Sequence, residues 1–307
     1  MRFRFQPWQL AVLLIVVCVA AVWGIYTLRL RGGASPSDLI SYLPTANATV
    51  VYIDVDALRR SGMLAMIAGS KAAEELEYRQ FVEETLFDYR QDLDAIAAAF
   101  KDGQVFFALR GRFRWKNLME YAKRQGGSCH NGFCTVNGSE PKRRISFYPL
   151  RSNVMAMATS TDDFAAYQVT RNAGKLLMPP PNEPAWALVP AAMLRNADSL
   201  PSGTKAYASA LQKADQIVFT IGPEDDHLQL ALQVTCPDVQ SATALLADFD
   251  NTTDTLRKWI AREHQQANPA DLSGILVAGT FRRDDKRFYG KWPISRAFVD
   301  SLTGGSF

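Results

Sequence analysis

Two cysteines, Cys129 and Cys134, are separated by four residues, a spacing that a metal site, a redox couple, a nucleophile or a disulfide could use. Between them lies Asn131-Gly132, the kind of dipeptide that most strongly predicts a two-residue β-hairpin turn. A turn at these residues places the two cysteines opposite each other as a non-hydrogen-bonded pair, with Cα atoms about 4.5 Å apart. A disulfide accepts this separation, so the sequence predicts a structural Cys129–Cys134 bridge.

The other uses of this cysteine pair fit less well. A structural zinc site needs four ligands, and only His130 lies nearby as a third. A thioredoxin-like couple has two intervening residues rather than four, and a catalytic cysteine needs a base, to which neither His227 nor His264 is linked by the sequence. Reduced thiols packed in a core remain the alternative. A disulfide implies an oxidising compartment, and Cys236, which has no predicted partner, is expected to be a buried free thiol.

The sequence lacks three motifs that commonly mark catalysis or cofactor binding. It contains no Gly-x-Ser-x-Gly elbow, no glycine-rich phosphate loop and no His-Glu-x-x-His pair. We therefore predict no catalytic residue, no cofactor-binding residue and no metal ligand, which makes an enzyme the less favoured class.

Three alternating arginines, Arg110, Arg112 and Arg114, would share one face of a strand. Such a stripe is a candidate contact for an anionic ligand, lipid head groups or an acidic partner surface. The alternative is a polar sheet edge, on which charges deter aggregation.

The N-terminal segment predicts a membrane anchor. Residues 8–28 carry no charge and, as a helix, would span about 31 Å, close to the hydrocarbon thickness of a bilayer. A cleaved signal peptide is the alternative. The four arginines that flank this segment account for the positive net charge, since the rest of the chain has 30 basic and 31 acidic residues. Charge therefore gives no reason to expect a nucleic-acid partner.

The chain divides into segments at two breaks in composition. We predict a cytoplasmic tail at 1–7, the transmembrane anchor at 8–28, a linker at 29–38, a first module at 39–177, a proline-rich hinge at 178–184 and a second module at 185–307. Because the cysteines indicate an oxidising compartment, we expect a single-pass protein of the cytoplasmic membrane with its N-terminus inside and most of the chain periplasmic or extracellular.

Both modules follow the same order of elements: strand, helices, hairpin, helix, hairpin, helix. The first long hairpin is expected at 95–100 and 104–113, with a helix starting at Trp115; its counterpart is a hairpin around 222–227, with a helix starting at Val239 and continuing to Ile260. The predicted class is α+β, with a transmembrane helix followed by two related modules of antiparallel or mixed sheet and helices packed on the sheet.

The segment Leu43-Pro44-Thr45-Ala46-Asn47, which runs into an apolar strand, together with the anchor, resembles bacterial envelope proteins of unknown function that have an exported region. The resemblance implies a bacterial source and an extracytoplasmic α+β region, and it carries no catalytic residues. We therefore expect a non-catalytic binding or scaffolding module of the envelope, with the membrane (through residues 8–28), an envelope protein or a lipid as partner. The alternatives are a hydrolase-type envelope enzyme and a lipid- or glycan-handling module.

Overall fold

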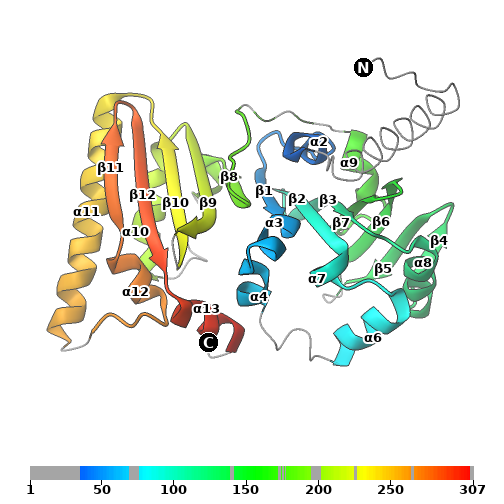
Figure 1. Ribbon diagram of the computed structural model, residues 1–307. Helices are drawn as coiled ribbons and strands as arrows, with labels where there is room; N and C mark the ends of the chain where they lie inside the picture. Colours follow the sequence, from blue (N-terminus) through cyan, green and yellow to red (C-terminus); the bar gives the residue numbers. More distant parts are fainter. Residues whose placement is uncertain are drawn as a thin grey trace, which may run out of the picture.

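The strands of the described residues form a single antiparallel sheet (Figure 1). The computed structural model describes residues 35–68, 76–138, 142–171, 174, 176, 178–194, 202–224, 227–263 and 266–304. Within these ranges twelve strands follow the order β11-β12-β10-β9-β8-β1-β2-β3-β7-β6-β5-β4. All the neighbouring pairs are antiparallel, as expected for strands joined by hairpins.

The strands are β1 Thr49–Asp54, β2 Leu93–Lys101, β3 Gln104–Gly111, β4 Ser128–His130, β5 Phe133–Asn137, β6 Arg144–Arg151, β7 Val154–Ser160, β8 Ala185–Val189, β9 Gln216–Glu224, β10 His227–Thr235, β11 Thr280–Asp284 and β12 Arg287–Ile294. The α-helices are α2 Pro36–Ile40, α3 Val55–Arg60, α4 Met63–Ala68, α6 Leu76–Thr85, α7 Tyr89–Asp92, α8 Trp115–Arg124, α9 Gln168–Arg171, α10 Ser202–Ala210, α11 Val239–Arg262, α12 Leu272–Val277 and α13 Arg296–Gly304. Short 3₁₀ turns occur at η1 Ala165–Tyr167 and η3 Leu211–Lys213.

The two halves of the sheet have the same strand order when each is followed outward from the centre. β1 pairs with β8 in the middle of the sheet, with Val50 opposite Leu188 and Tyr52 opposite Trp186. From there the first half continues β2, β3, β7, β6 and the second half continues β9, β10, β12, β11 (Figure 1). The first half then adds the β5–β4 hairpin at its outer edge.

Helices cover both faces of the sheet in the first half. The face named here the α2 face carries alternate residues such as Val50 and Ala97 and packs against Leu39 and Ile40 of α2. The opposite face, named the α8 face, includes Phe107 and the residues in register with it across the sheet. α8 lies over this face in the first half and α11 lies over it in the second.

One continuous sheet corrects part of the predicted fold. The α+β class is confirmed, but the strands of the two halves join into one sheet instead of forming two. The reason lies in β1, whose apolar side chains point to both faces: Val50 and Tyr52 to one, Val51 and Ile53 to the other. A strand that is apolar on both faces is typical of the interior of a sheet that is covered on both faces, and there β8 supplies the second neighbouring strand.

The predicted transmembrane helix is likewise corrected. Among the helices of the described ranges, none combines the length and the apolar composition that crossing a bilayer requires. Residues 8–28, on which that prediction rested, lie outside the described residues.

Candidate ligand-binding groove

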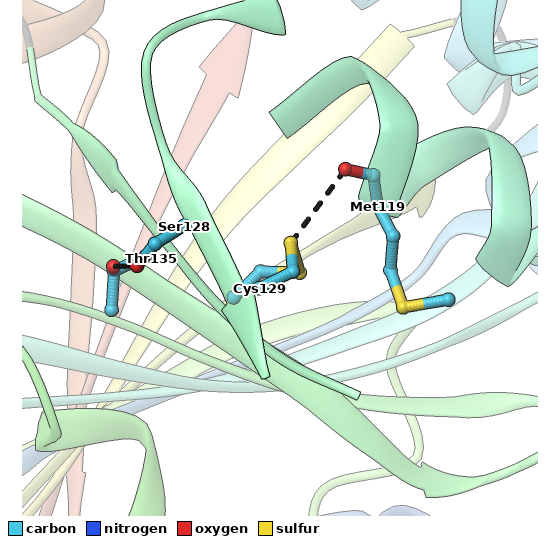
Figure 2. Close-up of a disulfide and its surroundings, with 5 residues drawn as sticks. Met119, Ser128, Cys129 and Thr135 are labelled. Atoms are coloured by element: carbon cyan, nitrogen blue, oxygen red, sulfur yellow. Dashed lines mark hydrogen bonds between the residues drawn. A yellow bond between two sulfur atoms is a disulfide. The ribbon is translucent and has the colours of Figure 1, made fainter. Parts of the chain in front are cut away.

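The predicted disulfide is present, and it closes the β4–β5 hairpin at the outer end of the sheet (Figure 2). Cys129 and Cys134 are in register, with Cα atoms 4.1 Å apart. The turn residues Asn131 and Gly132 have φ of 50° and 82°, which is the left-handed geometry that a type I′ hairpin turn requires. Asparagine and glycine adopt this geometry at low cost, which explains why this dipeptide sets the cysteine register.

The disulfide also lies against helix α8. The Sγ atom of Cys129 is 3.6 Å from the carbonyl oxygen of Met119, in the middle of that helix (Figure 2). Cys134 is fully buried and lies opposite Phe147 of β6, on the α8 face. The bridge therefore stabilises the hairpin at the point where it meets both α8 and the sheet.

Next to this contact, an apolar groove of about 600 Å³ runs between α6, α8 and the α8 face of the sheet. Its floor is formed by strands β2, β3, β5, β6 and β7, and its sides by the two helices and the segments beside them. None of the lining residues is charged: Phe81, Phe87, Leu93, Leu109, Phe113, Leu118, Tyr121, Ala122, Gln125, Val136, Asn137, Ile145, Phe147, Met155 and Met157.

The groove exists because α8 is too short to cover the strands beneath it. α8 has 10 residues, about 15 Å of helix, whereas α11 has 24 residues, about 36 Å. Under α11 the same sheet face is filled by a cluster of rings that includes Phe249, Phe288 and Trp292. In the first half, by contrast, Leu109 and Phe147 remain only half-buried on the groove floor.

Polar groups occur only at part of the groove lining, and they are the uncharged side chains of Tyr121, Gln125 and Asn137. Burial raises the pKa of the Tyr121 hydroxyl, and the carboxylates of Glu84 and Glu77 raise this pKa further. Glu84 is paired with Arg124 at 3.2 Å. The arrangement can hold an apolar molecule with a small polar end, and its lining offers no nucleophile paired with a base.

The three alternating arginines are not arranged as a stripe on one strand, because β3 ends at Gly111. Arg110 is buried. Burial and the carboxylate of Asp54 raise the pKa of the Tyr52 hydroxyl, and the charge of Arg110 and its hydrogen bond to Tyr52 partly oppose this rise. Arg112 forms an ion pair with Asp92 at 3.1 Å and donates to the carbonyl oxygen of Gln91.

Arg114 is exposed at the N-terminal end of α8, outside the strand. Arg110 and Arg112 are engaged with other residues of the protein. An anion contact by the three arginines stays a prediction.

Cys236 is a buried free thiol, as the sequence predicts. Burial raises the pKa of its thiol, and Asp215 and Asp238 raise it further, so the thiolate is disfavoured. Across the described part of the chain, no three histidine, cysteine, aspartate or glutamate side chains gather as metal ligands.

Sequence reasoning missed the groove. Its lining comes from segments scattered between Phe81 and Met157, and only the fold brings them together. One signal was available: strand 154–160 has apolar residues on both faces, yet the predicted helix after Trp115 is short. A strand of this type needs cover on both faces, so a short helix predicts an incompletely covered one.

The comparisons with known proteins give a structural likeness only. No protein-family model and no curated protein matches the chain. Among solved structures, crystal forms I, III and IV of TP0453 are similar at 10% sequence identity and TM-scores of 0.47 to 0.49, covering 87–88% of this chain and 98–99% of TP0453. At these values the likeness supports no inference about the function of this chain.

Proposed function

We propose that this protein is a non-catalytic binding protein of the cell envelope that holds the hydrocarbon part of a lipid-like molecule in the groove between α8 and the sheet. The observation that carries the proposal is the uncharged, predominantly apolar lining of this groove. Its volume, about 600 Å³, is within the range of small-molecule binding sites.

The chemistry of the lining favours a flexible chain over a rigid polar ligand. Leucine, isoleucine and phenylalanine side chains give the floor and sides a continuous apolar surface. A hydrocarbon chain that covers this surface gains about 25 cal/mol of binding free energy per Å² of apolar surface removed from water. Met155 and Met157 lie side by side in alternation on β7, and the unbranched thioether adapts to ligands of varied shape. A sugar or nucleotide would leave most of its hydrogen-bonding groups unpaired in such a groove.

A location outside the cytoplasm is the second part of the proposal. It is supported by the Cys129–Cys134 disulfide, because structural disulfides persist in oxidising compartments and are rare in the cytosol. A binding protein there would meet lipids in the envelope.

The test is displacement of a neutral fluorescent probe, 1-aminoanthracene, by straight-chain alcohols of increasing length. Each methylene buried in the groove should contribute up to about 0.8 kcal/mol, which corresponds to about fourfold in affinity per carbon. We expect the affinity to rise with chain length and to level off once the groove is filled. Displacement that does not depend on chain length would contradict the proposal.

Two matched substitutions locate the binding. Met157→Glu places a charge on the groove floor and should abolish binding, whereas Met193→Glu makes the same change at an exposed position outside the groove and should leave affinity unchanged. Met157→Trp, which fills the groove without adding charge, should also block the probe and serves where the glutamate variant fails to fold. Equal affinities for all the variants would show that the ligand binds elsewhere.

A further inference from the structure

The polar groups of the groove lining suit a neutral ligand. Tyr121 offers a phenol hydroxyl, while Gln125 and Asn137 each offer a carboxamide. All three side chains can both donate and accept hydrogen bonds, which suits an alcohol or an amide, and they can donate to the carbonyl oxygen of an ester. None supplies a positive charge for a carboxylate or phosphate.

Two arginines next to these polar residues are paired with carboxylates. Arg124, which precedes Gln125, pairs with Glu84 at 3.2 Å. Arg144 donates to the Oδ1 atom of Asn137 and pairs with Asp163 at 3.1 Å. Each arginine thus belongs to a pair with no net charge, and an anionic ligand would have to compete with its carboxylate.

The electrostatic environment of the Tyr121 hydroxyl points the same way. Burial, Glu84 and Glu77 all disfavour a negative charge at this oxygen, since together they raise its pKa. Gln125 caps the C-terminus of α8, so the negative end of the helix dipole also faces this region. A ligand carboxylate beside Tyr121 would meet the same opposition as a phenolate.

From this geometry we propose that the groove selects amphiphiles whose polar end is uncharged, such as a fatty alcohol, a fatty amide or a glycerol ester, over fatty acids and other anionic lipids. This inference rests on the proposed function, because it concerns the ligand of the same groove. It assigns Glu84 as a specificity-determining residue that acts through charge on the polar end of the ligand.

The experiment compares two ligands that share a twelve-carbon chain and differ only in the polar end: dodecanol and dodecanoate. Each displaces 1-aminoanthracene from the full chain, below the ligand's micelle concentration and at a pH where the carboxylate is fully ionised. We expect dodecanol to bind about tenfold more tightly, a modest value because the Glu84 side chain is partly solvated. Tighter or equal binding of dodecanoate would overturn the selectivity while leaving the groove as the ligand site; no displacement by either ligand would overturn the proposed function itself.

Glu84→Gln tests the assigned residue. The substitution removes the carboxylate and leaves Arg124 without this partner, so the affinity for dodecanoate should rise about tenfold while that for dodecanol stays within about twofold. Glu83→Gln is the matched control, since it makes the same charge change at the adjacent, exposed position of α6 and should leave both affinities unchanged. Parallel effects of the two variants, or no effect of Glu84→Gln, would show that Glu84 does not set specificity.

Discussion

Removal of the Cys129–Cys134 disulfide should destabilise the chain by about 2 kcal/mol. The two cysteines are 5 residues apart in sequence. In the chain-entropy model, closing a loop of this size removes about 7 cal/mol/K of conformational entropy from the unfolded chain, which corresponds to about 2 kcal/mol at 25 °C. Cys129 packs against Met119 of α8, and Cys134 is buried on the sheet. We expect the reduced thiols to keep these contacts, so that their loss adds little to the entropic destabilisation of about 2 kcal/mol.

The assay is urea unfolding followed by tryptophan fluorescence, with and without dithiothreitol. Reductant should lower the free energy of unfolding of the natural chain by about 2 kcal/mol. The double variant Cys129→Ala/Cys134→Ala should already be destabilised and should not respond to reductant, while Cys236→Ala should respond as the natural chain does. An equal response to dithiothreitol in the double variant, or none in the natural chain, would refute the reasoning.

Three further predictions concern the core and the acid end of the pH range. Tyr207→Phe removes the 2.7 Å hydrogen bond to the buried Thr253 and should cost about 1–3 kcal/mol in urea unfolding, much of which Thr253→Val should restore in the double variant. Phe249→Ala should cost about 3–5 kcal/mol in the same assay because it empties the ring cluster under α11. Although burial opposes the shift, hydrogen bonds from Tyr78 and Arg90 lower the pKa of Asp88 in the folded protein. The stabilisation by Asp88 is therefore present above the unfolded pKa of about 3.9 and is lost as the pH falls through the lower folded pKa. In unfolding free energies measured across this pH range, Asp88→Asn should flatten the dependence on pH.

Local turn chemistry made the hairpins predictable. Asn131-Gly132 set the cysteine register, and the breaks near Asp102 and Glu224 marked the β2–β3 and β9–β10 hairpins. Helical periodicity from Val239 predicted a long helix, and α11 does extend to Arg262. These features depend on residues close together in the sequence, where backbone preference and side-chain alternation act directly.

The central β1–β8 pairing could not be predicted in the same way. Val50 and Leu188 lie opposite each other although more than a hundred residues separate them, and no turn specifies their register. The uninterrupted apolar run in β1 shows that both of its faces are apolar, but not which strand becomes its neighbour. Long-range pairing depends on burial across the whole sheet, and this is why the two predicted modules share one sheet.

The end of strand β3 is predicted wrongly from the sequence for a related reason. The alternation of Arg110, Arg112 and Arg114 predicts one strand face, but the backbone leaves the sheet after Gly111, where a Cβ atom would lie 2.4 Å from the carbonyl oxygen of Asp92. Close approach of two backbones at a glycine ends the regular strand, and sequence alternation alone gives no sign of it.

The central claim, that a hydrocarbon chain occupies the groove, is tested most directly by NMR of methionine methyl groups labelled with ¹³C during a titration with dodecanol. Met155 and Met157 line the groove, whereas Met63 and Met193 lie outside it. We expect the resonances of Met155 and Met157 to shift in a saturable manner while those of Met63 and Met193 stay in place. Unchanged groove resonances at saturating dodecanol, or equal shifts of all four, would contradict the account.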